Sequence, residues 1–357
     1  MKRTRALLCV PVAVTLIALT ACAPSNGGSG AGGSGADGDS VALVVAQGGL
    51  GDQSYNDLAN EGFTRAVADA GLTSSTIESE DIVGQGEQLL RRAGQAGINL
   101  VVDLEFSHNE VIGKVASDFP ESDWVIFNAE SAGDNVASVL FQEQEGSYLA
   151  GALAAMQTTN TSDPKINADK KLGVIGGASS VGIDKFLVGF IQGAQAIDPE
   201  IEVLTAYSND FADPAKGQQL AQAMFEQGAD IVYAVAGGTG AGVIQAAQDA
   251  NHYAIGVDDN QDGQAPGFVL TSVLKRADLA VESVIGDYAR GEFPGGKTIT
   301  FGLKEDAVGL TDFEFTKDAI APESLAKIDE LTAGIVSGEI TVWNVVTDGY
   351  PDFFPGK

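Results

Sequence analysis

Residues 41–70 read VALVVAQGGLGDQSYNDLANEGFTRAVADA, and the fold prediction starts from this stretch. The continuous apolar run Val41–Ala46 is typical of a parallel strand that is buried on both faces. Asn56–Ala70 follows with Phe63 and Val67 four residues apart, which is helical spacing. A strand, a glycine-rich turn and a helix in this order predict the first unit of a parallel α/β sheet.

The same alternation continues to residue 141 and starts again near residue 171. Apolar runs predict strands at Leu100–Leu104, Trp124–Asn128, Ala137–Phe141, Leu172–Ile175, Glu202–Ala206, Ile231–Val235, Tyr253–Val257 and Phe268–Leu274. Helical spacing predicts helices at Glu87–Ala96, Glu110–Phe119, Gly146–Met156, Lys185–Ile197, Lys216–Glu226, Ala241–Ala250 and Asp278–Arg290. Two such series predict an α/β protein with two similar Rossmann-like lobes.

The N-terminus has the three parts of an export signal. Lys2, Arg3 and Arg5 precede a short apolar run, and Leu19-Thr20-Ala21-Cys22 resembles the bacterial lipobox. We therefore predict that residues 1–21 are a lipoprotein signal peptide, because the apolar run is marginal for spanning a bilayer. Acylated Cys22 would anchor the protein at the outer face of the cell membrane. An ordinary secretory signal with a chance cysteine is the alternative interpretation.

The segment after Cys22 is rich in Gly, Ser, Ala, Asn and Asp as far as residue 40. Such a composition cannot bury an apolar core, so residues 22–40 are predicted to be the lipidated cysteine and a flexible tether. The roughly 315 residues that follow suit two lobes better than one core. We expect residues 41–141 plus about 271–297 to form the N-terminal lobe. Residues 142–270 plus about 298–357 would form the C-terminal lobe.

Composition excludes several classes of function. Cys9 leaves with the signal and Cys22 is lipidated, so no thiol remains for a disulfide, a zinc site or a nucleophile. His108 and His252 are the only histidines, which is too few for a multi-histidine metal site and argues against a Ser-His-Asp triad. We therefore predict no metal and no cofactor. The formal net charge of −29 argues against binding of nucleic acid. The excess of acidic residues can form a solvated surface, or an acidic face that binds a basic partner.

In open α/β sheets, ligands bind beyond the carboxyl ends of the strands. The residues at these places are Asp52 and Asn56, Phe106, Phe186, Gly237, Asp258 and Lys275. Aromatic rings with Asn, Asp and Lys suit a neutral, flat ligand that forms hydrogen bonds, such as a nucleoside. A phosphorylated ligand would require several Arg or Lys residues at the loop tips, and these are scarce.

Each of these residues also has a structural interpretation. Asp52 or Ser54 can simply cap the first helix. Phe106 and Phe186 can belong to the core. Asp258 can be a turn residue, and Lys275 can be a solvated lysine. The glycines at 237, 238, 240 and 242 follow a strand, but their spacing does not fit a dinucleotide fingerprint.

Six segments occur in the order found in the basic membrane protein family, the bacterial purine nucleoside receptor lipoproteins. They are GDQSYN at 51–56, FQEQEGSYLAG at 141–151, FLVGF at 186–190, AGGTG at 236–240, GVDDNQ at 256–261 and TSVLK at 271–275. The resemblance spans roughly residues 41–315. Tyr55 departs from it, because the family usually has Phe there. His108 also departs, because an acidic or small residue is common there.

The resemblance implies a type I periplasmic-binding fold with a hinge of three crossings and no catalysis. It implies that Asp52 and Asn56 contact the purine edge, and that Phe106 and Phe186 stack on the base. Gly237 would approach through its backbone. The ribose would be held by Asp258 and Lys275.

We therefore predict a monomeric nucleoside-binding lipoprotein that delivers its ligand to the permease of an ABC importer. One alternative is the binding of another neutral solute, such as a sugar. A second is a nucleoside-sensing subunit without transport. A third, an enzyme such as a nucleoside hydrolase, is disfavoured because no nucleophile–base pair or cofactor motif is present.

Overall fold

A computed structural model describes residues 38–355, whose strands form two six-stranded sheets. Cys22 and the predicted signal peptide lie outside the described residues. The first sheet has the order β11-β5-β4-β3-β1-β2. Its strands are β1 (Ser40–Val44), β2 (Thr73–Ile77), β3 (Leu100–Asp103), β4 (Asp123–Phe127), β5 (Val136–Phe141) and β11 (Thr298–Phe301).

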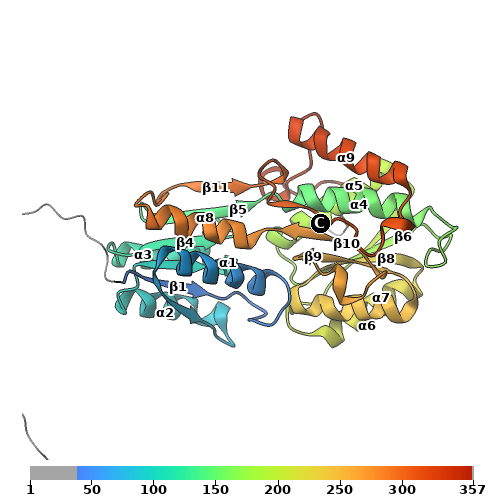
Figure 1. Ribbon diagram of the computed structural model, residues 1–357. Coiled ribbons are helices and arrows are strands. Elements are labelled where there is room, and N and C mark those ends of the chain that lie inside the picture. Colours follow the sequence, from blue (N-terminus) through green and yellow to red (C-terminus); the bar gives the residue numbers. More distant parts are fainter. Residues whose placement is uncertain (1–37, 356–357) are drawn as a thin grey trace, which may run out of the picture. The chain divides into compact units, whose positions relative to one another are not determined.

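The second sheet has the order β12-β10-β9-β8-β6-β7. Its strands are β6 (Lys171–Gly176), β7 (Glu202–Tyr207), β8 (Ala229–Val235), β9 (Tyr253–Asp258), β10 (Val269–Lys275) and β12 (Val308–Leu310). Within each sheet all neighbouring strands are parallel, except that β12 is antiparallel to β10. The strands of the two sheets lie in separate halves of Figure 1. The predicted α/β class with two Rossmann-like lobes is confirmed.

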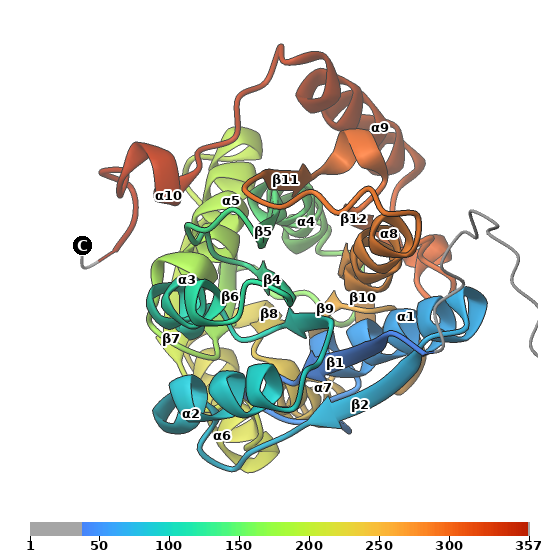
Figure 2. The same ribbon diagram turned by 90° about the vertical axis from the view of Figure 1, so that its left-hand side faces the viewer.

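Helices cover both faces of each sheet. On the first sheet, α1 (Tyr55–Ala70) and α8 (Ala277–Ala289) lie on one face, opposite α2 (Ile82–Gln95) and α3 (Asn109–Asp118) (Figure 2). On the second sheet, α4 (Glu143–Thr158) and α5 (Val181–Ile197) lie opposite α6 (Pro214–Glu226) and α7 (Gly240–Ala250). The chain ends with α9 (Pro322–Ser337) and α10 (Val345–Asp348). None of the described helices is long and apolar enough to span a bilayer.

The first strand shows why this arrangement forms. Val41, Leu43 and Val44 are fully buried, because helices pack on both faces of β1. Burial of each such side chain contributes about 1.5–3 kcal/mol. The continuous apolar run at 41–46 therefore fits a central parallel strand, and β1 lies between β2 and β3.

The chain crosses between the two sheets three times. It crosses after β5, after β10 and after β11, as the order of strands in the two sheets requires. The expected lobe boundaries at about 271 and 298 stay a prediction, and the crossings between the sheets lie a few residues from them. Strand β10 pairs with β9 in the second sheet, and β11 pairs with β5 in the first, so the crossings follow Lys275 and Phe301. Hydrogen-bond pairing, which an apolar pattern does not reveal, sets these boundaries.

Candidate ligand-binding site

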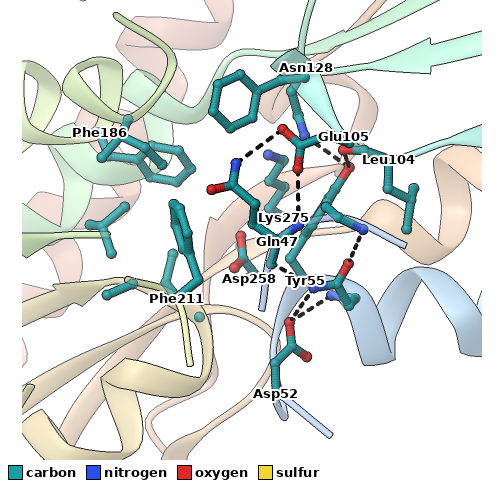
Figure 3. Close-up of a pocket in the computed structure, with 18 residues that line it drawn as sticks. Gln47, Asp52, Tyr55, Leu104, Glu105, Asn128, Phe186, Phe211, Asp258 and Lys275 are labelled. Carbon is teal, nitrogen blue, oxygen red and sulfur yellow. Dashed lines mark hydrogen bonds between the residues drawn. The ribbon is translucent and has the colours of Figure 1, made fainter. Parts of the chain in front are cut away.

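The loops that follow the carboxyl ends of the strands surround one pocket (Figure 3). The pocket encloses about 570 Å³ of space, which includes open solvent at its mouth. All seven predicted ligand residues line it: Asp52, Asn56, Phe106, Phe186, Gly237, Asp258 and Lys275. The sequence prediction missed other lining residues, among them Gln47, Tyr55, Glu105, Asn128 and Phe211.

Asp52 makes four hydrogen bonds with Ser54 and the first turn of α1. Its carboxylate accepts from the backbone N–H groups of Ser54 (2.9 Å), Asn56 (2.9 Å) and Asp57 (3.1 Å), and from the Asn56 side-chain amide (3.1 Å). These bonds cap α1, so the structural interpretation of Asp52 holds alongside its position in the pocket. Burial raises the pKa of Asp52 despite the three backbone N–H groups, which oppose this shift.

The Asn56 amide also connects neighbouring segments. Its oxygen accepts from the backbone N–H of Ala46 at 2.9 Å, and its nitrogen donates to the carbonyl of Gln47 at 3.2 Å. With the bond to Asp52, both amide hydrogens have partners. In this geometry Asn56 fixes the turn between β1 and α1.

Glu105 is a buried carboxylate that the sequence analysis passed over as a ligand. It accepts from the backbone and side chain of Gln47 at 3.0 and 3.1 Å, and from the backbone and hydroxyl of Ser107 at 3.1 and 2.6 Å. These bonds join the loop after β1 to the loop after β3. Glu105 therefore holds the segment that carries Phe106 into the pocket.

His108, which departs from the family pattern, supports the same loop from behind. Its side chain is 1% exposed. Nδ1 lies 2.7 Å from Asp103 Oδ2, and Nε2 lies 2.9 Å from the carbonyl of Ile82. Since both ring nitrogens face acceptors, the imidazolium form satisfies this site. Burial lowers the pKa of His108, but the Asp103 carboxylate outweighs this and raises it overall.

Phe186 and Phe211 bring aromatic rings to the pocket from the second half of the molecule (Figure 3). Phe211 lies in the loop after β7, and two glycines accommodate it. A Cβ on Gly177 would come within 2.2 Å of the Phe211 ring. Gly237 has a φ of +53°, a left-handed conformation that favours glycine. The backbone at Gly237 was predicted to approach the ligand closely, and it also packs against Phe211.

Asp258 ends β9 with a φ of +67°, an uncommon conformation for a residue with a side chain. Its Oδ2 accepts a 2.7 Å hydrogen bond from the Ser54 hydroxyl, which belongs to the first half of the molecule. Burial raises its pKa to about 6, although nearby Lys275 and the Ser54 hydroxyl favour the charged form. Backbone strain and a raised pKa at a pocket are features of functional sites.

Lys275 is buried, so the solvated interpretation of this lysine is excluded. Its ammonium lies 3.0 Å from Glu143, whose other oxygen lies 2.5 Å from Lys185. Burial opposes ionisation of Glu143, but the two lysines outweigh it and lower the pKa of Glu143. The same ammonium faces the rings of Tyr55, Phe141 and Phe186 at 4.8–5.6 Å. Glu143 therefore holds the Lys275 side chain at the inner wall of the pocket.

Tyr55 and Asn128 form one further polar group in the wall. The Asn128 amide nitrogen donates to the Tyr55 hydroxyl at 2.8 Å. The Asn128 oxygen is buried and has no hydrogen-bond partner among the described residues. This oxygen is therefore available to accept from a ligand. Within residues 38–355, no group of three or more His, Cys, Asp and Glu side chains is placed to hold a metal ion.

Comparison with known proteins agrees with this fold. Residues 39–344 match the family described as ABC transporter substrate-binding protein PnrA-like, also called Bmp. A Listeria monocytogenes protein named CD4+ T-cell-stimulating antigen is 33% identical, with 96% of this chain and 98% of that protein covered. The ABC transporter nucleoside-binding protein BmpA of Lactococcus lactis is 32% identical over 95% of this chain and 99% of its own.

A solved structure of an ABC transporter solute-binding protein is also similar to this chain. The ABC transporter solute-binding protein of Aeropyrum pernix K1 superposes with a TM-score of 0.80 at 30% identity, over 85% of this chain and 93% of its own. The chain therefore belongs to the Bmp family of ABC transporter substrate-binding proteins, and it has the type I periplasmic-binding fold.

Proposed function

We propose that the protein is an extracytoplasmic lipoprotein that binds a purine nucleoside and delivers it to the permease of an ABC importer. The observation that carries the proposal is the pocket itself, where aromatic rings lie beside the Asp258 carboxylate and the Lys275 ammonium. Rings suit a flat base, and a paired acceptor and donor suit the ribose hydroxyls. The relative from Lactococcus lactis that is named for nucleoside binding supports the same ligand class.

The proposed contacts divide by chemistry. Phe106 and Phe186 stack on the base, and Gly237 approaches it through its backbone. Asp52 and Asn56 meet the purine edge, although both already have protein partners. Because the Asn128 oxygen has no partner among the described residues, we add it as an acceptor for the base. Asp258 and Lys275 hold the ribose.

A thermal-shift panel of nucleosides, free bases and pentoses tests this proposal. Inosine or guanosine is expected to raise the melting temperature, since a ligand that binds only the folded state at 100 times its Kd stabilises by about 2.7 kcal/mol. Stabilisation by pentoses alone would establish the sugar-binding alternative. Release of free base on incubation with a nucleoside would instead identify a hydrolase.

The proposed membrane anchor is tested separately at Cys22. The Cys22→Ala chain is expected to lose palmitate labelling and to remain unprocessed by the lipoprotein peptidase or appear in the medium, because the lipobox thiol is absent. Cys9→Ala is the matched control, since this residue leaves with the signal peptide. A Cys22→Ala chain that is still labelled and membrane-bound would contradict the anchor.

A further inference from the structure

Ser54 stands at the N-cap of α1, yet its side chain makes no cap bond. A serine at this position ordinarily accepts a hydrogen bond from an N–H in the first turn. Here the Asp52 carboxylate accepts from the N–H groups of Asn56 and Asp57. The Ser54 hydroxyl is therefore free to bond outside its own helix.

That hydroxyl crosses to the second half of the molecule. It donates to Asp258 Oδ2 at 2.7 Å and lies 3.3 Å from the carbonyl of Val257. Ser54 is fully buried and Asp258 is 7% exposed. Hydrogen bonds to a carboxylate are about twice as strong as those between neutral groups, and this one is shielded from water.

A second bond crosses beside the first. The Gln261 amide nitrogen donates to the carbonyl of Gln53 at 2.9 Å. The Gln261 oxygen accepts from the backbone N–H of Val257 at 3.0 Å, and this bond fixes the orientation of the amide. Two consecutive residues of the first half, Gln53 and Ser54, are thus each bonded to the segment that contains Asp258.

We propose that Ser54 and Gln261 form an interlobe latch, which holds the two lobes together through protein atoms alone. Ser54 is also a positioning residue, because its bond to Oδ2 orients the Asp258 carboxylate in the pocket. Both bonds must break before the lobes separate, so the latch slows ligand release. The kinetic consequence rests on the proposed nucleoside function, whereas the conformational consequence does not.

The test uses the full chain with Cys9 and Cys22 replaced by Ser. Spin labels are attached at Val83→Cys in α2 and Val181→Cys in α5, two exposed positions in different halves. Ser54→Ala removes one bond of the latch. Gln261→Glu replaces the donor with an oxygen that faces the carbonyl of Gln53, and it keeps the acceptor for Val257. Ser138→Ala is the control, because among residues 38–355 its buried hydroxyl bonds only to the backbone N–H of Ser131, within the first half.

Pulsed electron resonance without nucleoside is expected to show longer interlobe distances in both latch variants and unchanged distances in the control. Stopped-flow binding of guanosine is expected to show a dissociation rate that is about 10-fold faster or more in the latch variants. Unchanged distances in both latch variants would overturn the latch, even if dissociation became faster. Longer distances in a protein that binds no nucleoside would support the latch and refute the proposed ligand.

Discussion

Asp52 follows β1 in the first sheet and Asp258 ends β9 in the second, so the two carboxylates occupy similar places in their lobes. Their surroundings differ. Asp52 receives four hydrogen bonds from Ser54 and the first turn of α1, whereas Asp258 receives one from a residue of the other half and has a left-handed backbone. Two carboxylates that follow buried strands can thus differ in how far the protein itself occupies their oxygens. The number of acceptor sites that the protein leaves open separates the two.

Removal of the Asp52 carboxylate is expected to have the largest effect, and this effect is on the free energy of unfolding. Asp52→Ala is expected to lower the free energy of unfolding by about 3 kcal/mol, because three backbone N–H groups and one amide lose their acceptor. Urea denaturation followed by circular dichroism measures this change. Asp52→Asn keeps one acceptor oxygen and should show an intermediate loss. A loss below about 1 kcal/mol would show that Asp52 is an ordinary exposed cap.

Asp258 is expected to affect how strongly the protein prefers guanosine over a nucleoside without ribose hydroxyls. Asp258→Ala should weaken guanosine about 10- to 100-fold, since a buried ribose hydroxyl without its partner costs about 1–3 kcal/mol. It should weaken 2′,3′-dideoxyguanosine much less, because that ligand lacks the hydroxyls. Asp52→Ala should weaken both ligands by similar factors, since both carry the same base.

Calorimetry on two variants and two ligands gives the coupling energy between side chain and hydroxyls. Asp258→Asn is the control for the backbone, because Asn tolerates the left-handed conformation better than Ala. Equal losses for guanosine and the dideoxynucleoside would contradict the assignment of Asp258 to the ribose.

Apolar patterns predicted the central strands, because those strands are buried on both faces. They did not predict β2, whose residues TSSTI are mostly exposed at the edge of the first sheet. Strand β11 and helix α9 were also missed. An edge strand forms through hydrogen bonds to its neighbour, and its own side chains carry little of that information.

The sequence predicted those pocket residues that lie in the loops just after the carboxyl ends of predicted strands. Phe211 was missed because it lies four residues beyond the end of β7, in a loop whose course the sequence does not reveal. Asn128 was missed because it was taken as the last residue of a strand, whereas β4 ends at Phe127. The partners of Asp52 and Ser54 depend on loop geometry, which residue type alone does not determine.

The pH dependence of binding should also separate the two carboxylates. Burial raises the pKa of Asp258 to about 6, so the folded protein takes up a proton there as pH falls from 7 to 5. If the charged form accepts from the ribose, guanosine should bind about 10-fold more weakly at pH 5 than at pH 7. Calorimetry at both pH values measures this. Asp258→Asn should abolish most of the difference, and a pH dependence that persists in that variant would assign it to another group.

The raised pKa of Asp258 also affects the stability of the fold. Low pH is expected to weaken ligand binding but to favour the folded state. Because the pKa of Asp258 is higher in the folded protein than in the unfolded chain, the folded protein binds more protons between about pH 4 and pH 6. The contribution of Asp258 to the free energy of unfolding therefore falls as pH rises through this window. Asp258→Asn should flatten the corresponding part of a plot of stability against pH. An unchanged plot would contradict the raised pKa.

The smallest change is expected for Asp57, which lies in the first turn of α1. Its carboxylate accepts from the backbone N–H groups of Gly51 at 2.7 Å and Gln53 at 2.9 Å, and it does not line the pocket. Both bonds are exposed to solvent, so water replaces them in Asp57→Ala and the expected loss of stability is about 1 kcal/mol. Guanosine affinity should change by less than about 3-fold. Denaturation and calorimetry on the same preparation measure both, and a larger loss than in Asp52→Ala would reverse the ranking of the two carboxylates.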